Sequence, residues 1–156
     1  MQGDGQVLEL LNEVLTGELT AVNQYFLDAK MFDNWGYAHL GERFRSESIG
    51  EMKDADRLIQ RILYLEGHPN VQRLGNVQIG ETASEKLTLA LELEREAILR
   101  LNRGIALSVE RADNGTRDLL EDILKGEEGH ADWLETQLAL IGQIGEAHYL
   151  AQQIRD

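Results

Sequence analysis

A single proline, Pro69, occurs in 156 residues, and no other feature of the sequence restricts the fold more strongly. Proline interrupts helices because it lacks an amide hydrogen and clashes with the preceding turn, so long helices are permitted on both sides of Pro69. Valine, isoleucine and threonine occur singly rather than in the alternating runs that are typical of strands. The chain is therefore predicted to be all-α.

Apolar residues recur every three or four positions along four long segments, which is the spacing of a helix with one buried face. The predicted helices cover residues 6–34, 39–66, 82–111 and 116–143, and a short fifth helix covers residues 147–154. In the first helix the predicted buried stripe consists of Leu8, Leu11, Leu15, Val22, Phe26 and Ala29. Residues 1–156 are predicted to form one helical domain.

Capping signals mark where two of these helices begin. Thr82 and Glu85 fit a capping box, in which each of the two side chains bonds a free backbone amide. Asn114-Gly115 is typical of a turn, and Thr116 is predicted to be the N-cap of the helix that follows.

The segment between the second and third helices, residues 67–81, is longer than most connections within compact domains. If extended, it spans roughly 50 Å at about 3.3 Å per residue, whereas a helix of about 27 residues is roughly 40 Å long. The segment can therefore run the whole length of a helix, so that the second helical hairpin starts from the far end. This predicts a four-helix bundle with one long crossover loop and a short C-terminal helix.

Acidic residues and one histidine interrupt the apolar stripes near the middle of the four long helices. They are Glu18, Glu51, Asp54, Glu94, Glu127 and His130. A buried carboxylate without a partner costs several kcal/mol or takes up a proton, and several carboxylates in one core repel each other. Bound cations would relieve both problems, and oxygen ligands with one imidazole suit Fe, Mn or Zn. The sequence therefore predicts a metal centre inside the bundle.

The spacing of these residues supports the metal centre. Glu51 follows Glu18 by 33 residues, and Glu127 follows Glu94 by the same number, so the two hairpins place their carboxylates equivalently. Asp54 and His130 each follow a glutamate by three residues, which puts each pair on one helix face. The alternative is that these are solvated side chains on helices whose buried face has been misassigned.

Charge and composition exclude several classes of function. Lys and Arg total 15 against 28 Asp and Glu, which gives a net charge of −13, whereas proteins that bind nucleic acid are usually basic. There is no cysteine, which excludes disulfides and thiolate metal sites. No apolar run approaches the roughly 20 residues of a membrane span, and Met1-Gln2-Gly3-Asp4 does not resemble a signal peptide. We expect a cytoplasmic protein that binds neither nucleic acid nor membranes.

The sequence resembles the bacterioferritins over essentially its whole length. The stretches that carry the resemblance include Glu18-Leu19-Thr20-Ala21, Asn23-Gln24-Tyr25-Phe26-Leu27, Asn34-Trp35-Gly36, Glu51-Met52-Lys53, Glu127-Glu128-Gly129-His130 and Asp132-Trp133-Leu134-Glu135-Thr136. The resemblance implies a ferritin-like four-helix bundle and a hollow homo-oligomeric cage of about 24 subunits. It also implies Fe(II) oxidation, storage of ferric mineral, haem b between paired subunits and a ferredoxin-like electron donor.

The resemblance also implies roles for individual residues in a di-iron ferroxidase centre. Glu51 and Glu127 would bridge two irons, Glu18 and Glu94 would be terminal ligands, and His130 would be a further ligand. These assignments are implied by the family and not by spacing alone.

Asp54 departs from the family, which has histidine at this position. A fifth carboxylate would give the centre a charge of −5 against +4 from two Fe(II), where four carboxylates would balance the metal. The extra charge favours the ferric state if Asp54 ligates, and a short side chain that fails to reach would weaken Fe(II) binding. We therefore expect an altered centre with unequal metal sites.

Met52 and Tyr25 are assigned by the same resemblance. Met52 would be the axial haem ligand, one from each of two paired subunits, although an exposed methionine beside Ile49 and Ile59 also suits a plain subunit contact. Tyr25 would lie near the metals and donate an electron or a hydrogen bond, or it is a core tyrosine with a satisfied hydroxyl.

Two other functions stay open at this point. In one, the chain is a haem-binding cage subunit whose centre is impaired by Asp54, and a second subunit type supplies the catalysis in a mixed cage. In the other, the bundle is a di-iron or di-manganese peroxidase or catalase, although such an enzyme needs neither the fifth helix nor Met52. Fe(II) oxidation by the pure protein separates the ferroxidase from the first alternative.

Overall fold

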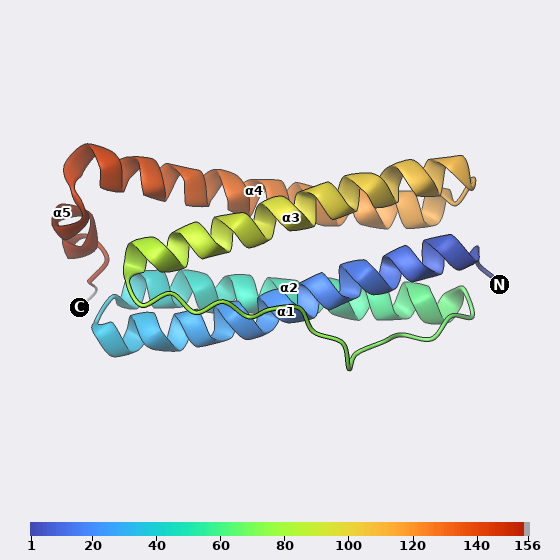
Figure 1. The fold of residues 1–156 in the computed structure, drawn as a ribbon, viewed down its shortest axis with the longest axis horizontal. Coiled ribbons are helices and arrows are strands. Elements are labelled where there is room, and N and C mark those ends of the chain that lie inside the picture. Colours follow the sequence, from blue (N-terminus) through green and yellow to red (C-terminus); the bar gives the residue numbers. More distant parts are fainter. Residues whose placement is uncertain (155–156) are drawn as a thin grey trace.

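Five helices and no strand are present in residues 1–154, the part of the chain that the structure, a computed structural model, describes (Figure 1). The bundle consists of α1 (Gly5–Trp35), α2 (Ala38–Tyr64), α3 (Ala83–Glu110) and α4 (Asn114–Ile144), followed by the short α5 (Glu146–Ala151). The predicted fold class is confirmed, and the last two residues of the predicted domain 1–156 lie outside the described range. None of the described helices is long and apolar enough to cross a membrane.

The four long helices form two antiparallel hairpins that pack against each other. α1 packs mainly on α2, α3 packs mainly on α4, and α1 also contacts α3. The crossover between α2 and α3 runs along the bundle beside α1, so that α3 starts at the end where α1 stops (Figure 1). α5 lies at this same end, whereas the N-terminus lies at the opposite end.

Polar side chains four residues apart on α1 hold the crossover in place. They share one face of the helix because residues at this spacing lie one turn apart. The contacts are Asn12 with the Asn70 amide (2.8 Å), Thr16 with the Arg73 guanidinium (3.0 Å), Thr20 with the Gly75 amide (2.8 Å) and Gln24 with the Gln78 amide (3.1 Å). The long connection is therefore fixed by side chains as well as by its length.

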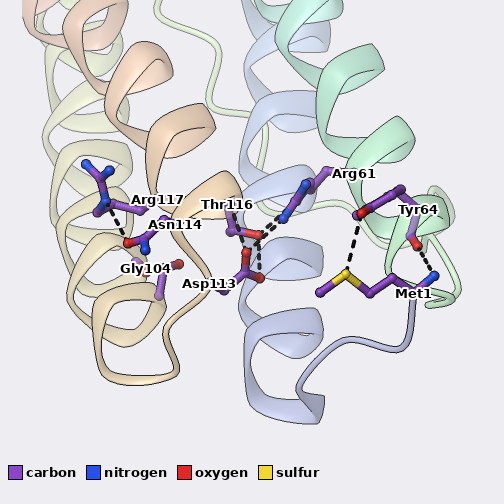
Figure 2. A network of polar contacts seen from close by, with 9 residues as sticks. Met1, Arg61, Tyr64, Gly104, Asp113, Asn114, Thr116 and Arg117 are labelled. Carbon is purple, nitrogen blue, oxygen red and sulfur yellow. Dashed lines mark hydrogen bonds and ion pairs between the residues drawn. The ribbon is translucent and has the colours of Figure 1, made fainter.

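The start of α4 differs from the prediction. Asp113 rather than Thr116 is the N-cap, and its Oδ1 accepts a hydrogen bond from the Thr116 amide (3.1 Å). The predicted turn at 114–115 is wrong, because these residues already belong to the helix and the chain reverses around Ala112 (φ 56°). Arg61 of α2 donates to Asp113 Oδ1 (2.8 Å) and Thr116 Oγ1 (3.0 Å), as Figure 2 shows. A carboxylate at this helix end is favoured by the helix dipole and by the Arg61 charge.

The other helix ends differ by smaller amounts. Thr82 is the N-cap of α3 as predicted and accepts from the Glu85 amide (3.1 Å), but Glu85 itself bonds the amide of Glu81 (2.8 Å) rather than that of Thr82. α5 ends at Ala151, three residues before the predicted end. Helix ends fray, so shifts of this size are ordinary.

Two apolar clusters fill the bundle and are separated by a polar layer. The first contains Tyr25, Phe32, Leu40, Phe44, Leu87, Leu91 and Leu134. The second contains Leu11, Leu15, Leu58, Ile62, Leu101, Leu120 and Ile123. Along α1 the layer falls between Leu15 and Ala21, and the acidic residues at the middle of the other three helices fall into the same gap.

The predicted stripe on α1 is wrong at Phe26, which is 55% exposed. Tyr25 faces the core in its place and is 0% exposed, whereas the predicted Ala29 is buried at 1%. The buried stripe continues from Leu15 and Glu18 through Tyr25, Ala29 and Phe32 at steps of three, four or seven residues, and Phe26 lies one position, about 100°, away from it.

Candidate metal centre

The polar layer between the two clusters contains five of the six predicted ligands in fully buried positions. Their exposed fractions are 3% for Glu18, 4% for Glu51, 1% for Glu94, 2% for Glu127 and 2% for His130. All four long helices contribute, so the buried charges meet at mid-height of the bundle. The alternative of solvated glutamates on misassigned faces does not agree with this burial.

Four of the carboxylates converge on one point. Ligand oxygens of Glu18, Glu51, Asp54 and Glu127 all lie within 4.8 Å of one another. Metal–oxygen bonds of about 2 Å place two ligands up to about 4 Å apart across the metal, so small side-chain shifts would bring these oxygens onto one cation. Asp54 is short but reaches this group.

Asp54 has a cationic neighbour that offsets its charge. It is half-buried, and its Oδ1 lies 3.7 Å from Nη1 of Arg57, one turn further along α2. Arg57 also pairs with Asp122 of α4 at 2.7 Å. Burial raises the pKa of Asp54 to about 6, although the Arg57 charge opposes the rise. The fifth carboxylate is therefore partly neutralised by a residue outside the centre.

His130 and Glu94 form the other side of the centre. His130 Nδ1 lies 3.0 Å from Glu94 Oε1, and the Tyr25 hydroxyl donates a hydrogen bond to the same oxygen at 2.5 Å. Within the described residues Glu94 belongs to neither of the two groups whose ligand atoms all lie within 4.8 Å. Tyr25 is fully buried and thus fixes the Glu94 carboxyl through a direct bond.

Three aromatic rings hold the His130 imidazole in position. Tyr25 meets it edge-on at 5.3 Å between ring centroids, and Phe44 does so at 6.3 Å. Trp133, three residues later on α4, stacks on it at 6.1 Å with an interplanar angle of 24°. Burial lowers the pKa of His130 to about 4, so the ring is neutral at neutral pH and able to ligate a metal.

The carboxyl groups are poorly stabilised as anions without a cation. Burial raises the pKa of Glu94 to about 8. It also raises the pKa values of Glu51 and Glu127 well above their usual range. Repulsion from Glu127 adds to the rise in the pKa of Glu51. Glu18 Oε2 and Glu94 Oε2 are buried and lack a hydrogen-bond partner, as does His130 Nε2. Unpartnered carboxylate oxygens beside one imidazole form a donor set that fits Fe, Mn or Zn.

The sequence interpretation missed one acidic residue at the centre. Ligand atoms of Glu47, Glu51 and His130 all lie within 4.8 Å of one another, and Glu47 Oε2 is 3.5 Å from His130 Nδ1. Glu47 precedes Glu51 by four residues, so it lies one turn earlier on the same face of α2. This spacing was an available signal, but Glu47 does not interrupt an apolar stripe because it is only half-buried.

Met52 lies away from the centre. It is 52% exposed on α2, and Ile49, one turn earlier, is exposed as well. This agrees with a surface that contacts another molecule, whereas the haem-binding role of Met52 stays a prediction.

Comparison with known proteins identifies the family. Residues 8–144 match the family model of the ferritin-like domain. The chain is 52% identical to the bacterioferritin of Mycobacterium leprae, covering 97% of this chain and 96% of the relative. It is 49% identical to bacterioferritin BfrA of Mycobacterium tuberculosis with the same coverage. It is also 49% identical to the bacterioferritin of Streptomyces coelicolor, covering 99% of this chain and 92% of the relative. The chain therefore belongs to the bacterioferritin family of ferritin-like proteins.

Proposed function

We propose that this protein stores iron and oxidises Fe(II) to Fe(III) at the polar layer inside its bundle. The observation that carries the proposal is the set of buried carboxylates from four helices, with unpartnered oxygens, around one neutral histidine. Membership of the bacterioferritin family supports the iron-storage part. Fe(II) is the substrate in this proposal.

Two substrate ions bind at the two sides of the layer. Glu18, Glu51, Asp54 and Glu127 converge within 4.8 Å and suit the first ion. Glu94 and His130 suit the second, and Glu51 and Glu127 bridge the two ions in the assignment that the family implies. Because burial raises the pKa of Glu94 to about 8 and that of Glu127 well above its usual range, both carboxyls favour a proton without a cation, and ion binding displaces it.

The donor set drives the redox step in the required direction. Anionic oxygen ligands stabilise Fe(III) more than Fe(II), because the attraction grows with the charge of the ion. The electrons released go to O₂ or peroxide, which takes up protons as it is reduced. Tyr25 holds Glu94 by its hydroxyl and is close enough to the second ion position to give up an electron.

Asp54 makes the two ion positions unequal. It adds a carboxylate to the first position only, and its charge is reduced by Arg57 at 3.7 Å. The proximity of Asp54 to Glu18, Glu51 and Glu127 argues against an impaired centre. The haem-binding cage subunit that relies on a catalytic partner is therefore less well supported than a ferroxidase.

The family also supports a larger assembly. We infer a cage of about 24 copies of this chain, in which ferric product collects as mineral. The exposed Met52 would hold haem b together with the Met52 of a second copy. Haem supplies an electron carrier for iron release when bound, with a ferredoxin-like protein as the donor.

Aerobic stopped-flow measurement with the purified protein tests this function. Fe(II) added to the wild-type protein should be oxidised much faster than Fe(II) in buffer. The variant Glu127→Gln should lose most of this rate, whereas Glu128→Gln, an exposed neighbour on α4, should retain it. Equal rates for protein and buffer would reject the ferroxidase.

A further inference from the structure

His130 Nδ1 faces two carboxylates from different helices. Glu94 Oε1 of α3 lies 3.0 Å from it, and Glu47 Oε2 of α2 lies 3.5 Å from it. A neutral imidazole nitrogen makes one strong bond, either to a hydrogen-bond partner or to a metal, so the two carboxylates are alternative neighbours of one ligand atom. The Glu94 side chain is 1% exposed and the Glu47 side chain 22%, so only the Glu47 side is open to solvent.

Glu51 belongs to both groups of potential ligands. One group contains Glu47, Glu51 and His130, and the other contains Glu51 with Glu18, Asp54 and Glu127. A cation held by the first group can therefore reach the second while it stays bound to Glu51. Within the buried centre, Glu18 Oε2 and Glu94 Oε2 have no hydrogen-bond partner, so they are available as the next ligands of the cation.

Arg43 holds the Glu47 side chain in place on the side of His130 that is open to solvent. Its Nε donates to Glu47 Oε1 at 3.0 Å, one turn away on α2. Its guanidinium lies over the Trp133 ring at 4.2 Å from the centroid, and Trp133 stacks on His130. Arg43, Glu47, His130 and Trp133 thus form a closed ring of contacts between α2 and α4. This ring orients Glu47 toward His130 and supplies a competing cation for its carboxylate.

We propose that Glu47, with Glu51 and His130, forms a transfer position that takes a divalent cation from solvent and passes it to the buried carboxylates. Arg43 keeps Glu47 in place until the cation replaces it. This inference rests on the proposed function, because it assumes that cations occupy the buried centre. It differs from that function in assigning to Glu47 a role in movement of the cation rather than in its final binding.

A transfer position has a distinct kinetic signature. It stabilises the cation between solvent and the centre, so removing it raises the barrier for entry and for exit alike. Uptake and release slow by a similar factor, and the affinity, which is their ratio, changes much less. A permanent ligand would instead change the affinity, mainly through faster release.

Co(II) binding tests the proposal without iron oxidation. Uptake is followed by stopped-flow absorption, release by adding a chelator, and affinity by titration calorimetry, all with the full-length protein. We expect Glu47→Gln to slow both uptake and release by about tenfold, which corresponds to a barrier increase of about 1.4 kcal/mol. Asp56→Asn removes an exposed acidic charge from the same helix and should match the wild type.

Replacing Arg43 should change the rate of Co(II) uptake in the opposite direction. Arg43→Gln frees Glu47 from its ion pair, so uptake should be faster than in the wild type by about two- to fivefold, the range for a partly exposed ion pair. Arg45→Gln, which removes an arginine that pairs with Asp33 instead, should leave uptake unchanged. In crystals with partial Co(II) loading, an anomalous peak beside Glu47 should accompany the peaks in the centre.

The outcomes separate this inference from the proposed function. Co(II) in the centre with Glu47→Gln and Asp56→Asn behaving alike would overturn the transfer position alone. A large loss of affinity in Glu47→Gln with unchanged uptake would make Glu47 a permanent ligand and would also overturn it. Absence of Co(II) from the centre in the wild type would reject the proposed function itself.

Discussion

The Tyr25 hydroxyl donates a hydrogen bond to Glu94 Oε1 at the middle of the bundle, and both side chains are at least 99% buried. The same oxygen lies 3.0 Å from His130 Nδ1, so one carboxyl connects α1, α3 and α4. The geometry of the second ion position depends on this connection.

Replacing Tyr25 with phenylalanine should loosen Glu94. We expect Tyr25→Phe to lower the free energy of unfolding of the metal-free protein by about 1–2 kcal/mol, the cost of a lost buried hydrogen bond. Fe(II) oxidation should slow by up to about tenfold, the lower end of losses seen when a group that supports a metal ligand is removed. Urea unfolding and stopped-flow oxidation measure the two effects.

Tyr149→Phe is the matched control. The Tyr149 hydroxyl is also engaged, with Gln137 at 2.7 Å, but α5 lies at the end of the bundle, away from the centre. It should lose a similar amount of stability and keep the oxidation rate. Equal oxidation rates in the two variants would mean that the Tyr25 hydroxyl does not position the centre.

Asp54 should control one ion position and not the other. Asp54→Asn removes one charged ligand from the group with Glu18, Glu51 and Glu127, so the affinity for one Co(II) per chain should fall by about 10–100-fold. The affinity for the other Co(II) should change little. Titration calorimetry resolves the two events, and Asp122→Asn, which alters only the exposed partner of Arg57, should cause at most a small change. Two equally weakened sites would contradict the assignment.

The metal-free protein should lose stability as the pH rises from 4.5 to about 8. Burial raises the pKa of Glu94 from 4.5 to about 8, so the folded state holds a proton that the unfolded state has released. The stabilising contribution is complete below pH 4.5 and is lost as the pH rises through 8. Glu51 and Glu127 act in the same direction, whereas His130, whose pKa is lowered from 6.5 to about 4, opposes them below pH 6.5. Urea unfolding between pH 5 and 9 measures the slope.

Glu94→Gln is the control for this pH dependence. It removes one titrating group, so the slope should become smaller. Adding Co(II) should oppose the loss of stability at high pH. A cation at 100 times its dissociation constant adds about 2.7 kcal/mol per site to the free energy of unfolding. A metal-free protein whose stability rises steadily over this pH range would contradict the protonated state of the centre.

A buried ion pair outside the centre should matter for stability alone. Lys86 Nζ of α3 lies 2.8 Å from Asp28 Oδ1 of α1, and both side chains are almost fully buried. Lys86→Met leaves Asp28 without its partner and should cost about 3–5 kcal/mol. The double variant Lys86→Met with Asp28→Leu should recover most of this loss in urea unfolding. A double variant as unstable as the single one would show that the cost is due to packing rather than to charge.

The sequence predicted the bundle and the acidic layer because both depend on helical periodicity. Glu18, Glu51, Glu94 and Glu127 stand within apolar stripes, and burial of the stripe buries the acid with it. The 33-residue spacing occurs once in each hairpin, and it places the four glutamates at equal heights along the bundle. The coordination of ions by these residues stays a prediction.

Other features depend on contacts between distant segments, which periodicity does not reveal. Lys86 is buried by pairing with Asp28, which is 58 residues away in the sequence, and a lysine is otherwise expected at the surface. Asp113 replaces Thr116 as the N-cap because Arg61 of another helix supports its charge. Glu47 is half-buried, and its place in the centre follows from the position of His130 on α4.

An anomalous-scattering map at the iron edge tests the central claim most directly. Crystals loaded with Fe(II) without oxygen should show one peak among Glu18, Glu51, Asp54 and Glu127, and a second beside Glu94 and His130. Iron found only on the outer surface, with no density between the two apolar clusters, would contradict the account.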